Sequence, residues 1–70
     1  MQKLGFIEFK ETFFNILTEH PLISPEILVF YEENFNNMLP DLYLYYNYTQ
    51  SFSIKDSVQT FCLTAIYFNL

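Results

Sequence analysis

The chain has 70 residues, and its eight acidic residues outnumber its three basic ones, which gives a formal net charge of −5. This charge repels phosphate backbones, so it disfavours nucleic-acid binding and favours basic proteins as partners. The single cysteine, Cys62, excludes an internal disulfide framework and is typical of a protein in the reducing cytoplasm.

Hydrophobic residues make up 51% of the chain, which includes nine Phe and six Tyr. A chain of this length forms a single domain, 1–70, and hides only roughly 60 to 65% of its unfolded surface. We therefore expect part of the apolar surplus to contact another chain, either a second copy in a dimer or a different protein. The uncharged stretches 42–54 and 57–70 are shorter than the about 20 apolar residues of a membrane span, so no membrane contact is expected.

An amphipathic pattern predicts a first helix over residues 5–19. Its apolar residues recur at spacings of three and four, while acidic and polar residues fall mostly between them. Pro21 ends this helix, because the residue before a proline avoids the helical region. The predicted buried face consists of Phe6, Phe9, Phe13, Ile16 and Leu17.

Ser24-Pro25-Glu26 predicts the start of a second helix, because serine caps exposed amide groups, proline suits the first turn and glutamate complements the helix dipole. Pro40, after two asparagines, is expected to end this helix near residue 38. Its predicted apolar stripe consists of Leu28, Tyr31, Phe35 and Met38. The opposite side carries Glu26, Phe30, Glu33 and Asn37, with Glu32 at the margin.

Residues 41–50 suit two structures. Tyr and Leu alternate as they do in a strand, while Leu39-Pro40-Asp41 is an equally suitable start for a short helix. We favour the short helix, because a lone strand would leave its hydrogen-bonding groups unpaired unless two molecules joined edges.

Ser53 to Asp56 resembles a capping box, with Asp in place of Glu or Gln, and predicts a last helix. Its apolar face consists of Ile54, Val58, Phe61, Cys62, Ala65 and Ile66. Its other face carries Ser57, Gln59, Thr60, Thr64 and Tyr67, none of them charged. The predicted fold is therefore all-α, a small antiparallel bundle of three to four helices whose third element is short and either helical or extended.

Residues that could carry chemistry are few. His20 is the only histidine, so no histidine pair or Cys-His dyad is available for a metal or a nucleophile. The adjacent carboxylates Glu32 and Glu33 point about 100° apart on a helix and would not share a proton. We therefore expect no catalytic residues, no metal, no cofactor and no enzymatic activity.

The most informative segment is the tyrosine run, Leu42 to Tyr48, which contains four of the six tyrosines. It begins directly after Asp41, the last of seven acids that precede the almost uncharged remainder of the chain. Tyrosines dominate binding hot spots, and acids around them steer a basic partner into place. The alternative is that these tyrosines belong to the core or to an oligomer contact.

This arrangement resembles the colicin and pyocin DNase immunity proteins, small acidic four-helix proteins that bind and inhibit a basic nuclease toxin. Ser24 to Val29, followed by Phe35, resembles the opening of that family's second helix, which carries specificity. Asp41-Leu42 with Tyr45-Tyr46 resembles its short third helix. The chain departs from the family by one extra residue between these two pairs, and by Asn47 where a proline usually follows.

The resemblance implies that the protein inhibits a basic toxin or a nucleic-acid-processing protein. It assigns Asp41, Tyr45 and Tyr46 as anchors for the toxin and Glu26, Glu32 and Glu33 as specificity residues. The alternative function is a homo-oligomeric structural or assembly subunit that uses its aromatic, uncharged C-terminal half as the interface.

Overall fold

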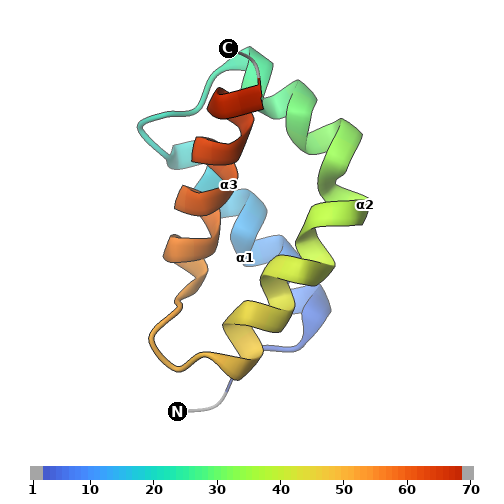
Figure 1. The fold of residues 1–70 in the computed structure, drawn as a ribbon, viewed down its shortest axis with the longest axis vertical. Coiled ribbons are helices and arrows are strands. Elements are labelled where there is room, and N and C mark those ends of the chain that lie inside the picture. Colours follow the sequence, from blue (N-terminus) through green and yellow to red (C-terminus); the bar gives the residue numbers. More distant parts are fainter. Residues whose placement is uncertain (1–2, 69–70) are drawn as a thin grey trace.

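The computed structural model describes residues 3–68, which form three helices and no strand. These are α1 (Phe6–Glu19), α2 (Pro25–Tyr48) and α3 (Ile54–Phe68) (Figure 1). The all-α class predicted from periodicity is confirmed. Within the described residues, no helix combines the length and the apolar character needed to cross a membrane.

Local signals set the start of α2 and α3. The Ile27 N–H donates to the Ser24 side-chain oxygen at 3.3 Å, and Pro25 occupies the first turn. At α3 the Ser53 N–H donates to the Asp56 carboxylate at 2.9 Å, and the Asp56 N–H donates to the Ser53 hydroxyl oxygen at 3.1 Å. Both predicted caps are confirmed, and each satisfies amide groups that have no partner inside the helix.

The predicted end of the second helix near residue 38 is wrong. Helix α2 continues through Pro40 to Tyr48, so residues 41–48 are neither a separate short helix nor a strand. Figure 1 shows that α2 is bent along its length, as expected for a helix with an internal proline.

Burial explains why Pro40 does not end the helix. A proline inside a helix costs about 3 kcal/mol or more, because it removes one hydrogen bond and crowds the preceding turn. Leu39 is fully buried, and Leu42 and Tyr46 are 6% and 7% exposed. Burying a large apolar side chain contributes about 1.5–3 kcal/mol, so Leu42 and Tyr46, the two of these residues that follow Pro40, together offset a cost of this size.

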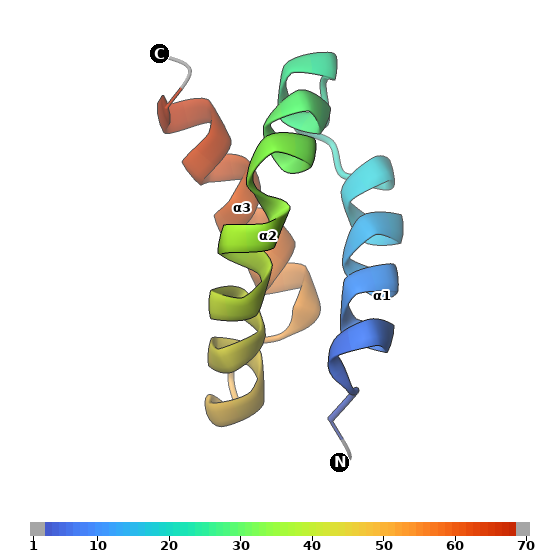
Figure 2. The ribbon, with the colours of Figure 1, turned by 90° about the vertical axis from the view of Figure 1, so that its right-hand side faces the viewer.

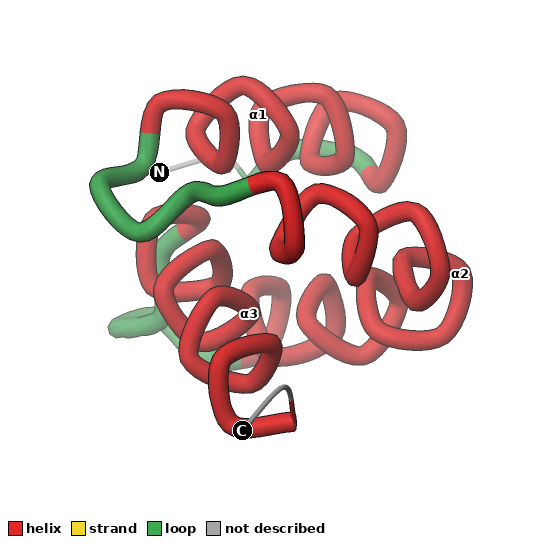
Figure 3. Tube along the Cα trace, turned by 90° about the horizontal axis from the view of Figure 1, so that it is seen from above, coloured by secondary structure: helices red, strands yellow, loops and turns green. Residues whose placement is uncertain are grey.

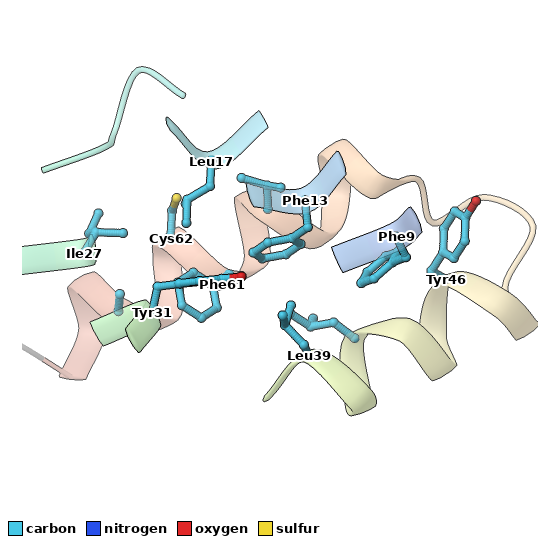
Figure 4. Packing of buried hydrophobic residues seen from close by; sticks show 12 residues of the cluster. Phe9, Phe13, Leu17, Ile27, Tyr31, Leu39, Tyr46, Phe61 and Cys62 are labelled. Atoms are coloured by element: carbon cyan, nitrogen blue, oxygen red, sulfur yellow. The ribbon is translucent and has the colours of Figure 1, made fainter. Parts of the chain in front are cut away.

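The core lies between the three helices, and each helix contributes one aromatic ring to its centre. The rings of Phe13 and Phe61 are T-shaped with centroids 5.6 Å apart, and Tyr31 lies 5.8 Å from Phe61 (Figure 4). Figures 2 and 3 show α1, α2 and α3 surrounding this common interior. In α1 the predicted stripe is confirmed at Phe9, Phe13 and Leu17, all fully buried.

Two residues predicted to face outward lie inward instead. Phe30 is partly buried and makes a T-shaped contact with Phe61 at 5.4 Å. Ser57 is fully buried, and its hydroxyl donates to the Ser53 carbonyl at 3.2 Å. The physical reason for Phe30 is that α2 packs against both α1 and α3, so it buries a wider arc than a single stripe.

Candidate protein-binding surface

The tyrosine run is divided between two sides of α2. Tyr43 and Tyr46 turn towards the segment before α1, where the Tyr43 hydroxyl donates to the Leu4 carbonyl at 3.1 Å. The Leu4 N–H donates to the Tyr46 hydroxyl oxygen at 3.0 Å. The centroid of the Phe9 ring lies 5.2 Å from that of Tyr43. It lies 5.1 Å from that of Tyr46 (Figure 4). Tyr46 therefore belongs to the core, and the partly buried Tyr43 packs against it, which is the alternative that the sequence left open.

Tyr46 is 7% exposed, so its ring is not available as a surface anchor. The cation of Lys3 lies 4.4 Å from the centre of this ring and covers it further. Tyr46 therefore supports α2 and the N-terminal segment rather than the candidate surface.

Tyr45 and Tyr48 lie on the outer side of α2, where they are 63% and 82% exposed. Together with neighbours at helical spacing they line a shallow hollow of about 460 Å³, which we call the tyrosine pocket. Its lining residues are Asp41, Leu44, Tyr45, Tyr48 and Thr49. Leu44, half exposed, and Tyr48 were not among the predicted contact residues. The spacing 41, 44, 45, 48 identifies them once the segment is known to be one helix.

The electrostatic environment of the tyrosine pocket is negative. Asp41 is exposed at one end of it. At the other end α2 finishes at Tyr48, and its last turn contains no basic residue to offset the partial negative charge of the terminal carbonyl groups. The pocket thus combines an aromatic wall with two sources of negative potential.

The predicted acidic residues divide in a similar way. Glu26 and Glu33 are exposed and, with Val29 and Phe30, line a second hollow of about 230 Å³ near the start of α2. Helical spacing places Glu26, Glu33 and Asp41 on one side of α2, which we call the acidic side. Glu32 is also exposed, but it points about 100° away from Glu33.

Helix α3 has an exposed apolar surface of a different kind, which we call the neutral face. Leu63, Tyr67 and Phe68 are 52%, 75% and 70% exposed. With Thr60 and Thr64 they line a hollow of about 390 Å³. The sequence has no charged residue after Asp56, so this face is uncharged along its length.

The residues that could take part in catalysis or metal binding have structural roles instead. The Leu22 N–H donates to His20 Nδ1 at 3.1 Å, so His20 Nε2 carries the proton and donates to Gln59 Oε1 at 2.8 Å. Cys62 is buried, and this burial raises the pKa of its thiol. Within residues 3–68, no three His, Cys, Asp or Glu side chains come together as a set of metal ligands.

Comparisons of the chain with protein-family models, with curated proteins and with solved structures found no match.

Proposed function

We propose that this protein is a small acidic inhibitor, not an enzyme, that binds a basic toxin or nucleic-acid-processing protein through the acidic side of α2. The observation that carries the proposal is the juxtaposition of exposed tyrosines with carboxylates. Tyr45 and Tyr48 share one hollow with Asp41, and Glu26 and Glu33 follow on the same side of the helix. The carboxylates would not attract a neutral partner and would repel an acidic one.

The two residue types have different roles in the proposed complex. An exposed ion pair contributes only about 0.2–1 kcal/mol, whereas a tyrosine at the centre of an interface contributes about 2 kcal/mol or more. The tyrosines therefore supply most of the affinity. The carboxylates accelerate association with a cationic surface and set its orientation.

Inhibition follows from where such a complex forms. A protein that acts on nucleic acid presents basic residues to the phosphate backbone. An acidic helix bound there covers these residues and repels the nucleic acid. The resemblance of Ser24 to Val29 to the start of the second helix of DNase immunity proteins favours a nuclease toxin as the partner. Asp41-Leu42 adds no support from that family's short third helix, because these residues lie inside α2. We place the complex in the cytoplasm, where the free thiol of Cys62 stays reduced.

The test uses the purified chain, with the product of the neighbouring gene in its native host as the first candidate partner. We expect a basic protein whose activity on nucleic acid falls when the chain is added. Binding should weaken steeply with salt. The variant Glu26→Gln/Glu33→Gln/Asp41→Asn should associate about tenfold more slowly at low salt, with most of the salt dependence lost.

Glu8→Gln/Glu11→Gln/Glu19→Gln is the matched control, because it removes the same charge from exposed positions on α1. It should retain most of the association rate. Equal slowing of association by both triple variants would mean that net charge alone explains the lower rate. That result would contradict the assignment of the binding surface to α2. Capture of only neutral or acidic proteins from the host would contradict the proposal as a whole.

A second candidate function is homo-oligomerisation through the neutral face of α3. It is favoured by one observation: Leu63, Tyr67 and Phe68 are exposed on a helix that carries no charge beyond its first turn. Light scattering of the isolated chain at increasing concentration tests it. A mass that rises to that of two chains supports the dimer, and the mass of one chain at the highest concentration rules it out.

A further inference from the structure

The tyrosine pocket has the chemistry of a receptor for one particular side chain. It is lined by two exposed aromatic rings, an apolar side chain and a carboxylate, from Tyr45, Tyr48, Leu44 and Asp41. The ring of Tyr45 packs against the ring of Phe52, with the two centroids 6.0 Å apart and an interplanar angle of 58°. One wall of the pocket is therefore held in place before any ligand arrives.

Three features of the pocket attract a cation. The faces of aromatic rings carry negative charge density and bind cations placed above them. Asp41 adds a full negative charge at one end of the pocket. The C-terminal end of α2, which has no basic residue in its last turn, adds the negative end of the helix dipole beside Tyr48 and Thr49.

The shape of the pocket selects among cations. Asp41 and Tyr48 are seven residues apart, which is about 10 Å along the helix axis, so the ligand must be long as well as charged. A guanidinium group is planar, stacks on an aromatic face and donates hydrogen bonds to a carboxylate in its own plane. An ammonium group is compact and strongly hydrated, so it would interact with the pocket through its charge alone.

We propose that the tyrosine pocket binds an arginine side chain of the partner protein. The guanidinium lies on the ring of Tyr45 and donates to the carboxylate of Asp41, while Leu44 and Tyr48 contact the methylene stem. This proposal rests on the proposed function for the identity of the partner, but the pocket can be tested without any partner.

The first experiment titrates isotopically labelled protein with three blocked amino acids and follows the NMR signals of Asp41, Leu44, Tyr45 and Tyr48. N-acetyl-arginine methylamide should give saturable shifts at these four residues. N-acetyl-lysine methylamide should bind about threefold to tenfold more weakly, since it lacks stacking. The citrulline analogue, which has the same shape without the charge, should give no saturable shifts.

Variants assign the roles within the pocket. Asp41→Asn should weaken arginine binding about tenfold, and Tyr45→Leu should do the same, because it keeps apolar bulk but removes the ring face. Tyr45→Phe should retain binding, because the ring remains. Tyr67→Leu on α3 is the matched control for an exposed tyrosine and should leave the titration unchanged.

Two outcomes would overturn the arginine site. One is equal binding of the arginine and lysine probes, and the other is saturable arginine shifts centred on Glu26 and Glu33 instead of the pocket. Arginine-selective binding at the pocket, together with a partner whose affinity does not change in Asp41→Asn, would instead contradict the proposed function while leaving the site intact. Binding of a partner through α2 without arginine selectivity would contradict the arginine site while leaving the proposed function intact.

Discussion

The acidic side of α2 and the neutral face of α3 both expose large aromatic residues, but they differ in charge. On α2, Tyr45 and Tyr48 share a hollow with Asp41. Glu26 and Glu33 lie nearer the start of the same helix. On α3, the hollow lined by Leu63, Tyr67 and Phe68 has no charged residue in its lining. Phe68 also stacks on Phe30 of α2, which lines the hollow with Glu26 and Glu33. Aromatic exposure alone therefore does not define the kind of partner.

Charge decides what each surface accepts. Two like charges 4 Å apart repel by about 1 kcal/mol in water and by about 4 kcal/mol at a protein surface, so two copies of the acidic side of α2 would oppose each other. Two neutral faces of α3 can meet without this cost. Under the proposed function, this difference favours a basic partner for α2 and a second copy for α3.

The largest effect should come from a residue that supports both surfaces. Phe61 is fully buried on α3 and contacts Phe13, Tyr31 and Phe30 from the other two helices. Phe61→Ala should lower the free energy of unfolding by about 3–5 kcal/mol, because it leaves a cavity at the centre of the core. Chemical denaturation followed by circular dichroism measures this loss. A change below about 1 kcal/mol would contradict the packing described for the core.

The most direct test of the comparison uses one double variant on each helix. Tyr45→Ala/Tyr48→Ala should weaken binding of the basic partner by about 2–4 kcal/mol, because it removes the exposed rings of the pocket. Leu63→Ala/Tyr67→Ala, matched in exposure, should leave this affinity within about threefold and act only on self-association. Calorimetry measures the first and light scattering the second. Equal loss of partner binding in both variants would abolish the distinction between the surfaces.

A smaller effect should separate Tyr43, which is partly buried and hydrogen-bonded, from the exposed Tyr48. Tyr43→Phe removes a hydrogen bond to the Leu4 carbonyl, so the free energy of unfolding should fall by about 1 kcal/mol. Tyr48→Phe, at an 82% exposed position, should change stability by less than about 0.5 kcal/mol. Thermal and denaturant unfolding compare the two variants. The same loss in both would mean that the run is not divided between core and surface.

The smallest expected effect concerns the start of α3, which positions its neutral face. The backbone hydrogen bond from Ser53, and then the bond from its side chain, hold the pKa of Asp56 below its ordinary value of 3.8. A carboxyl whose pKa is lower in the folded state stabilises the fold above pH 3.8. That contribution disappears as the pH falls through the lowered pKa. Unfolding curves between pH 2 and 5 should show a shallower pH dependence in Asp56→Asn, and an unchanged dependence would exclude this cap as a contributor.

Much of the candidate site could be predicted from composition and position in the chain. The excess of acids, their position before Leu42 and the tyrosine run beside Asp41 all indicated an acidic, aromatic contact surface. The sequence did not show which tyrosines face the core and which face outward, because that depends on whether the helix continues without a break through Pro40. With α2 continuous, a period of 3.6 residues pairs Tyr43 with Tyr46 on one side and Tyr45 with Tyr48 on the other.

Local signals in the sequence were enough to predict where α2 and α3 begin, because caps such as Ser24 and the Ser53–Asp56 pair act within four residues. Composition was enough to predict the sign of the surface charge. That α2 passes Pro40 depends on contacts with residues far away in the chain. The free-energy cost of a proline inside a helix arises within one turn. The burial of Tyr46, which offsets that cost, depends instead on Leu4 and Phe9, about 40 residues away. The same long-range contacts leave Tyr45 and Tyr48 facing outward, and so decide which tyrosines a partner can reach.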